Sequence, residues 1–256
     1  MKYLQTIILG SLLAGGILSS CDSVSEPDRF IPAEIDPQRS ILVEEYTGQN
    51  CVNCPDGHAA IKEIVASLGD SVVPVSIHAS SLAIAAPSGL KIEAGETYYK
   101  DAGSPALPAA VINMQTSPLQ IPAWGEAINK LIMTPTPFTV RPHATIDGDN
   151  YKIDVAFSAG EDYEGSLLVW VLENDVVARQ LDGPNLVKDY VHNHVLRAVV
   201  NGQWGEEVKL NAHVAQHREY TFALDPAWNK NNLYVVAFLY NQTGVAQVHA
   251  TPQSAH

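Results

Sequence analysis

Two cysteines three positions apart, Cys51 and Cys54, constrain the fold of this chain more than any other feature of its sequence. An aliphatic run that begins at Ile41 precedes them and predicts a buried strand. From Pro55 onward, apolar residues recur at three- and four-residue spacing, which predicts a helix, and proline suits its first turn because no backbone donor is needed there. Residues 72–78 are again mostly aliphatic and predict a second strand. The sequence therefore predicts the order strand, CxxC loop, helix and strand.

The cysteine pair is poorly placed to act as a stabilising crosslink. A bridge between Cys51 and Cys54 closes a loop of about four residues, for which chain entropy predicts about 2 kcal/mol, against more than about 4 kcal/mol for a loop of 100 residues. Redox chemistry is the better explanation, because the positive end of a helix stabilises a thiolate. We expect Cys51 to be the exposed nucleophile that attacks a client disulfide, and the more buried Cys54 to resolve the mixed disulfide.

The third cysteine of the chain, Cys21, ends a segment with the features of a secretory signal. Lys2 provides the positive start, and the apolar core is shorter than the roughly 20 residues that a membrane span needs. Residues 18–21, Leu-Ser-Ser-Cys, resemble the bacterial lipobox, which implies cleavage before the cysteine and acylation of its thiol and new amine. We therefore expect a signal peptide at residues 1–20 and a lipidated tether at residues 21–38. The alternative is a chance cysteine beside an ordinary cleavage site.

The CxxC segment resembles the thioredoxin-like superfamily, which has strand, CxxC-Pro and helix in this order. That superfamily also has a cis-proline that faces the disulfide and precedes a strand, and Pro108 fits this position. The resemblance further implies a buried acid on the strand before the motif, which helps proton transfer to the resolving cysteine. Glu45, six residues before Cys51, matches that acid by spacing. Asn50 stands where thioredoxin itself has tryptophan, so the direction of electron flow is left open.

The second half of the chain changes to a two-residue period. A predicted helix at residues 124–133 is followed by Thr-Pro-Thr-Pro, which marks a linker. Beyond it, residues 151–157 alternate polar and apolar side chains, and further short strand candidates are separated by turn signals. We therefore expect a thioredoxin-like α/β domain at residues 39–134, followed by an all-β domain, an immunoglobulin-like antiparallel β-sandwich, at residues 138–256.

Histidines near the cysteines allow metal-binding interpretations of the same region. Cys51, Cys54 and His58 provide three zinc ligands, but a closed structural site needs four and the chain has no second CxxC. Sulfur together with His58 and His78 would suit copper(I). Covalent haem c is excluded, because it needs CxxCH and position 55 is proline.

A second histidine pair lies in residues 181–197, which we expect to form a long excursion between strands. His192 and His194 alternate, so on a strand both rings would face the same way, an arrangement that metal sites use. A polar loop or strand edge is the simpler interpretation of this pair.

The whole layout resembles a narrower group, the 28-kDa outer-membrane-protein-related lipoproteins of Gram-negative bacteria. The match is carried by the lipobox, by Glu-Glu-Tyr-Thr-Gly at residues 44–48, by Cys-Val-Asn-Cys-Pro at 51–55, and by Tyr-Val-His-Asn-His-Val-Leu-Arg at 190–197 with Trp204 and Gly205. It covers nearly the whole mature chain. The resemblance implies a thioredoxin-like domain, a β-sandwich and attachment to the outer membrane, and it implies no settled biochemical activity.

Net charge and cysteine content indicate which classes of partner to expect. The net charge is −13, and no basic patch is visible to neutralise phosphates, so we expect no nucleic acid. The expected partners are the membrane, through the lipid anchor, and envelope proteins with thiols or disulfides. The expected catalytic residues are Cys51, Cys54, Pro108 and Glu45, with a redox-active disulfide and no metal or separate cofactor. The alternative is a non-catalytic binding or adhesion lipoprotein that uses the thioredoxin-like fold as a scaffold.

Overall fold

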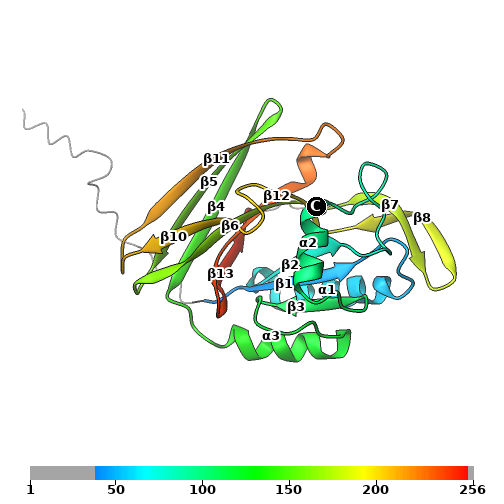
Figure 1. The fold of residues 1–256 in the computed structure, drawn as a ribbon, viewed down its shortest axis with the longest axis horizontal. Coiled ribbons are helices and arrows are strands. Elements are labelled where there is room, and N and C mark those ends of the chain that lie inside the picture. The colour runs from blue at the N-terminus through cyan, green and yellow to red at the C-terminus, as the bar shows by residue number, and fades with distance from the viewer. Residues whose placement is uncertain (1–37, 253–256) are drawn as a thin grey trace, which may run out of the picture. The chain divides into compact units, whose positions relative to one another are not determined.

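The computed structural model of the chain describes residues 38–252 (Figure 1). The predicted signal peptide at residues 1–20, the predicted lipidation site Cys21 and all of the tether except its last residue lie outside the described residues. In the described part, no helix is both long enough and apolar enough to cross a bilayer.

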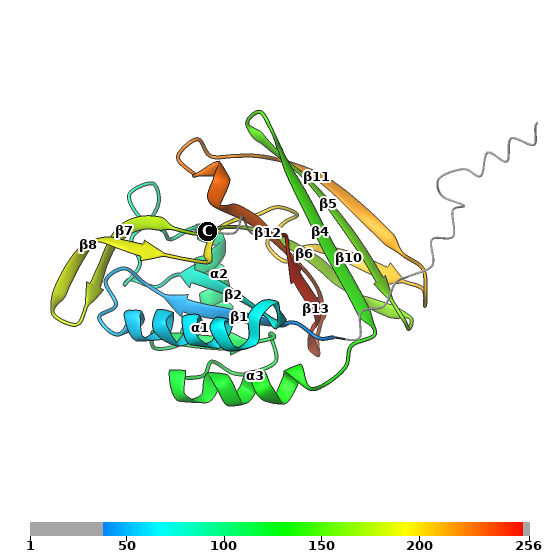
Figure 2. The ribbon, with the colours of Figure 1, turned by 180° about the vertical axis from the view of Figure 1, so that it is seen from behind.

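The largest element of the fold is a mixed eight-stranded sheet that contains strands from both halves of the chain (Figures 1 and 2). Its continuous path ends in antiparallel hairpin strands on one side and in the strand that follows Pro108 on the other. In spatial order the strands are β13 (Gly244–Ala250), β12 (Leu233–Asn241), β6 (Tyr163–Glu173), β9 (Val195–Val199), β2 (Val72–His78), β1 (Ile41–Thr47) and β3 (Ala109–Ile112), with β10 (Glu206–Leu210) paired to β6.

The predicted order strand, CxxC loop, helix and strand is confirmed. Strands β1 and β2 are parallel and are joined through helix α1 (Cys54–Leu68), and β3 pairs with β1 in the antiparallel direction. Helix α1 has Pro55 in its first turn. It ends at Gly69, whose φ of 56° lies in the left-handed region and whose N–H donates to the carbonyl of Val65.

Helices cover both faces of this part of the sheet. Ile61 of α1 and Trp124 of α3 (Trp124–Ile132) pack in one apolar cluster against alternate residues of β1 and β3. Tyr98 of α2 (Glu93–Asp101) packs in a second cluster on the other face. The predicted helix at residues 124–133 is thus confirmed, to within one residue at its end. Three short 3-10 helices complete the helical elements, Gly69–Ser71, Ile121–Ala123 and Lys230–Asn232.

A second, antiparallel sheet packs against the large sheet on the side of β6 and β12. It has the order β11 (Gln216–Ala223), β5 (Asn150–Ala159) and β4 (Phe138–Asp147). Val155 and Phe157 on β5 pack with Val169 and Val171 on β6 in a third apolar cluster, so the two sheets enclose a common core. The alternation predicted at residues 151–157 is confirmed in the burial pattern of β5. The chain is therefore mostly β-sheet with few helices, and several of its sheets are antiparallel.

The two halves of the chain are joined more closely than a linker at residues 134–137 suggests. Ser76 of β2 pairs with Val195 of β9, and the Ser76 N–H donates to the carbonyl of His194 at 2.7 Å. The second apolar cluster includes Val75 of β2 as well as Trp170 of β6. Because backbone pairing and one core both cross the predicted boundary, residues 39–134 and 138–252 share a sheet.

Most of the predicted excursion, residues 181–197, belongs to a separate two-stranded sheet that begins earlier, at Val176, and its last three residues lie in β9 of the large sheet. Strands β7 (Val176–Asp182) and β8 (Asn185–His192) pair as an antiparallel hairpin that turns at Gly183. In the chain this hairpin lies between β6 and β9, which are neighbours in the large sheet. It therefore extends from the central strands toward the beginning of α1 (Figure 2).

Candidate functional site

The two predicted redox cysteines are bonded to each other at the beginning of α1. The disulfide joins Cys51 in the loop to Cys54, the first residue of the helix, with the two Cα atoms 5.4 Å apart. Cys54 is completely buried, and Cys51 is only 4 % exposed. The expectation that Cys51 is exposed is therefore wrong for this state, because the β7–β8 hairpin lies over the loop that carries it.

The predicted acid Glu45 lies beneath the same helix. It is 1 % exposed, and its Oε2 accepts a hydrogen bond from the Ser76 hydroxyl at 3.0 Å. Both Glu45 and Pro108 approach the helix closely at Gly57, which has no side chain. A Cβ atom built on Gly57 would lie 2.7 Å from Oε1 of Glu45 and 3.1 Å from Cβ of Pro108. The structure therefore brings the acid, Pro108 and the first turns of α1 together. The peptide bond between Leu107 and Pro108 is cis.

Burial controls the protonation of Glu45. It raises the pKa of this carboxyl to about 8, against the lowering effect of the hydrogen bond from Ser76. Glu45 therefore holds a proton at neutral pH. Its neighbour Glu44, on the opposite face of β1, also has a pKa raised to about 8, by burial and then by the charge of Asp101. The sequence reasoning did not single out Glu44.

His58 of α1 connects this acid to the hairpin. Its Nε2 lies 2.9 Å from the Thr47 hydroxyl oxygen, and its Nδ1 lies 2.8 Å from the Tyr190 hydroxyl on β8. Burial lowers the pKa of His58 to about 3. Its Nε2 is also 3.9 Å from Glu45 Oε1, but a neutral imidazole beside a protonated carboxyl is not an ion pair at neutral pH.

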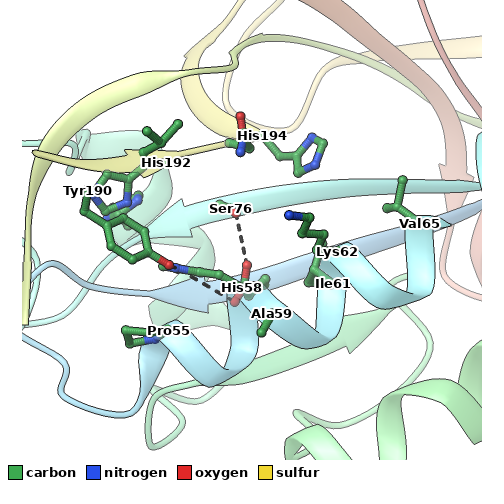
Figure 3. Close-up of a pocket in the computed structure, with 14 residues that line it drawn as sticks. Pro55, His58, Ala59, Ile61, Lys62, Val65, Ser76, Tyr190, His192 and His194 are labelled. Carbon is green, nitrogen blue, oxygen red and sulfur yellow. Dashed lines mark hydrogen bonds and ion pairs between the residues drawn. The ribbon is translucent and has the colours of Figure 1, made fainter. Parts of the chain in front are cut away.

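A cavity of about 530 Å³ lies between α1, β2 and the end of β8 (Figure 3). The rings of His78 and His192 approach to 5.2 Å between centroids, and those of His58 and His192 to 5.9 Å. His192 points into this cavity, whereas His194 bonds the Tyr234 hydroxyl at 2.9 Å. The simpler prediction for this pair, a loop or strand edge, is confirmed, because β8 ends at His192 and His194 lies outside any strand with a φ of 58°.

Buried polar atoms without hydrogen-bond partners are concentrated at this cavity. Of the seven such side-chain atoms among residues 38–252, five belong to its lining: Oε1 of Glu45 and both ring nitrogens of His78 and His192. Burial lowers the pKa of His192 to about 4 and that of His78 well below its ordinary value. Backbone groups of Ala178 and Arg179 raise the pKa of His192 but do not reach it with good hydrogen-bond geometry.

Three of the four residues considered for zinc and copper are engaged elsewhere, and His78 is the exception. The sulfurs of Cys51 and Cys54 are bonded to each other, and both nitrogens of His58 have hydroxyl partners. Within the described ranges, no group of three histidine, cysteine, aspartate or glutamate side chains is arranged to hold a metal ion. The cavity around His78 and Tyr190 was not predicted as a site. The only sequence signal for it was the alternation of Tyr190 and His192, which puts both on one face of a strand.

These features define a class of protein that is mostly β-sheet and has a CxxC disulfide at the beginning of a helix. The family outer membrane protein Omp28 matches residues 95–253, more than half of the chain, and the chain belongs to this family. Its location is therefore the outer membrane of the cell envelope. No curated protein sequence matches the chain.

Solved structures extend the comparison of the fold. HBP35 of Porphyromonas gingivalis is similar with a TM-score of 0.70 and 17 % identity, over 86 % of this chain and 77 % of that one. A protein from Agrobacterium tumefaciens is similar with a TM-score of 0.52 and 15 % identity, over 86 % of this chain and 100 % of that one. A domain of the outer membrane lipoprotein Omp28 from P. gingivalis is 26 % identical over 46 % of this chain and 92 % of its own length, with a TM-score of 0.34.

Proposed function

We propose that this lipoprotein exchanges thiols and disulfides with proteins of the cell envelope, through Cys51 and Cys54 in a thioredoxin-like N-terminal region. The observation that carries the proposal is the disulfide between Cys51 and Cys54 at the beginning of α1, with a protonated buried acid below the same helix. The order of β1, α1, β2 and β3, with Pro108 directly before β3, supports the thioredoxin-like assignment.

The exchange begins when a client thiolate attacks Sγ of Cys51. A client–Cys51 disulfide forms, the bond between Cys51 and Cys54 breaks, and Cys54 leaves as a thiolate. A second client thiolate then attacks the client sulfur of the mixed disulfide and releases Cys51. The client dithiol is oxidised by two electrons and the protein disulfide is reduced to two thiols. One client proton ends on Cys51, and the other restores Glu45 after that carboxyl has protonated Cys54. The reverse sequence reduces a client disulfide.

Glu45 is the proposed proton carrier for Cys54. The carboxyl holds a proton at neutral pH and lies against Gly57, one helical turn beyond Cys54. It protonates the Cys54 thiolate as that sulfur leaves, and its carboxylate accepts the proton in the reverse direction. Pro108 approaches Gly57 as well, and its proposed role is to contact the client chain beside the disulfide.

Lipidation at Cys21 is proposed to hold these groups at the membrane. Because an acylated Cys21 carries no free thiol, Cys51 and Cys54 are then the whole thiol content of the mature chain. The proposed partners are accordingly the membrane and thiol- or disulfide-bearing envelope proteins, with no cofactor beyond the disulfide.

Trapping tests the exchange directly. A full-length Cys54→Ala variant in its own membrane has no resolving thiol, so it should accumulate mixed disulfides through Cys51, and mass spectrometry identifies the clients. The matched control is Cys51→Ala with Cys54→Ala, which should trap nothing. Equal adducts from the single and double variants would contradict the proposal, and so would an absence of adducts from both.

A second candidate function, ligand binding, is favoured by the cavity. Five buried polar atoms without protein partners line one space of about 530 Å³, and a small polar molecule bound there would satisfy them. Native mass spectrometry of the membrane-purified chain should show an added mass that His78→Phe removes and His217→Phe, at an exposed position, retains. Identical native and denatured masses would contradict a binding role.

A further inference from the structure

The β7–β8 hairpin is attached to the backbone on both sides of Cys51. The Leu181 N–H donates to the carbonyl of Gln49 at 2.9 Å, and the Gly183 N–H donates to the carbonyl of Val52 at 3.0 Å. The end of β7 and its turn thus satisfy two carbonyls of the loop that carries Cys51. N–H groups of an extended peptide could satisfy the same two carbonyls.

Gln180 makes side-chain hydrogen bonds between the hairpin and the disulfide loop. Its side chain is completely buried, and its Nε2 donates to the carbonyl oxygens of Gly48 at 3.2 Å and Cys51 at 3.0 Å. Its Oε1 is buried without a hydrogen-bond partner. An unpaired buried acceptor is unfavourable and offsets part of what the two hydrogen bonds contribute. The cover over Cys51 is therefore held less tightly than the number of its contacts suggests.

The hairpin also contributes little to the apolar cores. None of the three apolar clusters found in the described part of the chain includes a residue from 176–192. Segments held by polar contacts rather than by buried apolar surface open at lower free energy than the core. Hence the hairpin can leave the loop while the sheets remain packed.

Exposed apolar side chains surround the same loop. Eight large apolar residues are exposed among residues 38–252, and five of them lie on the hairpin or on the loops that contact it. One of these loops carries the CxxC motif, and the other contains Leu82, whose carbonyl accepts a hydrogen bond from the Asn50 N–H. The five residues are Val52, Leu82, Val177, Leu186 and Val191. Exposed apolar groups on the hairpin and on the loops bonded to it fit a partner that offers an extended, partly apolar chain.

The geometry points to the backbone of residues 48–52 as the docking edge for an extended client peptide, with β7 as the internal segment that occupies this edge in the closed state. The partner is an unfolded or extended polypeptide whose N–H groups replace those of Leu181 and Gly183 at the same two carbonyls. The inference deepens the proposed exchange function and rests on it for the nature of the client. Displacement of β7 is the step that gives a client thiol access to Cys51.

Hydrogen exchange of the two hairpin amides tests the displacement. The probe is insulin B chain with its cysteines alkylated, so that it binds as an extended chain without thiol chemistry. With the oxidised full-length protein in detergent, saturating peptide should raise exchange of the Leu181 and Gly183 amides by at least about tenfold and leave β12 unchanged. Binding with unchanged exchange at both amides overturns the inference, as does the absence of binding to both the wild type and Gln180→Ala.

Variants of the hairpin provide a second measurement. Gln180→Ala should speed reduction of the disulfide by dithiothreitol about tenfold, which corresponds to about 1.4 kcal/mol. Arg179→Ala, a milder change that removes one 3.1 Å bond to Asn50 Oδ1, should speed it less. Lys188→Ala, at an exposed position on β8, is the charge-matched control and should have no effect. Equal rates in all four proteins would count against a covering role for β7.

The two proposals fail in different ways. If the alkylated peptide releases β7 but Cys54→Ala traps no client, the docking edge stands and the exchange function fails. If clients are trapped while Leu181 and Gly183 stay protected from exchange, the exchange function stands and the docking edge is wrong.

Discussion

Replacing Glu45 with glutamine removes a carboxyl whose ionisation the fold opposes. Burial raises the pKa of Glu45 from 4.5 to about 8. The unfolded chain loses this proton near pH 4.5, whereas the folded chain keeps it until about pH 8. The folded state is therefore favoured fully by this protonated carboxyl below pH 4.5, and this contribution to the free energy of unfolding is lost as the pH rises toward 8. A pKa difference of about 3.5 corresponds to a loss of on the order of 5 kcal/mol in the wild type. The Glu45→Gln variant has no ionisable group at this position, so it does not undergo this loss.

The assay is chemical denaturation of the oxidised wild type and Glu45→Gln between pH 5 and pH 9. Subtracting the two free energies of unfolding cancels the effects of other groups, including Glu44. The difference should shift in favour of the variant by up to about 1.4 kcal/mol per pH unit and become constant above about pH 8. Glu63→Gln, at an exposed position on α1, should give a constant difference throughout. A constant difference for Glu45→Gln would refute the protonated buried carboxyl.

Three further substitutions test the packing and charges around the site. Gly57→Ala places a Cβ 2.7 Å from Glu45 Oε1 and should lower the free energy of unfolding by about 1–3 kcal/mol in denaturant titrations. Arg197→Met removes the partner, at 2.7 Å, of the buried Glu173 carboxylate and should cost about 3–5 kcal/mol, whereas a loss below about 1 kcal/mol would mean that the pair is screened by solvent. Ser76→Ala removes a hydrogen bond that lowers the pKa of Glu45, so the midpoint of its carboxyl ¹³C titration should rise, and an unchanged midpoint would rule out that bond.

The elements around the CxxC motif could be predicted because their signals are local. An aliphatic run becomes β1, the three- and four-residue spacing becomes α1, and proline and glycine mark the two ends of that helix. For each of these elements the deciding residues lie within one or two turns of the chain, so no long-range information was needed. The cis bond before Pro108 was expected from the resemblance to the thioredoxin-like superfamily and not from a local signal.

The burial of Cys51 could not be predicted, because it depends on residues far away in the sequence. Nothing in residues 48–54 indicates that Gln180 will bond the carbonyl of Cys51. The pairing of Ser76 with Val195 also joins residues that are far apart in the sequence. The sequence pattern places these two residues in different predicted domains, so it gives no sign that their strands are neighbours. Periodicity gives the type of an element and the face that it buries, but not which strand lies beside it.

The path of the chain explains why the site depends on both halves. Strands β6 and β9 are neighbours in the large sheet and β9 pairs with β2, so the segment between β6 and β9 ends beside β2. The hairpin in this segment contacts the CxxC loop, α1 and His78 of β2, through Gln180, Tyr190 and His192. A fragment ending at residue 134 would lose these groups and leave the β9-facing edge of β2 unpaired. It would therefore report the reactivity of an uncovered CxxC motif and not that of the whole chain.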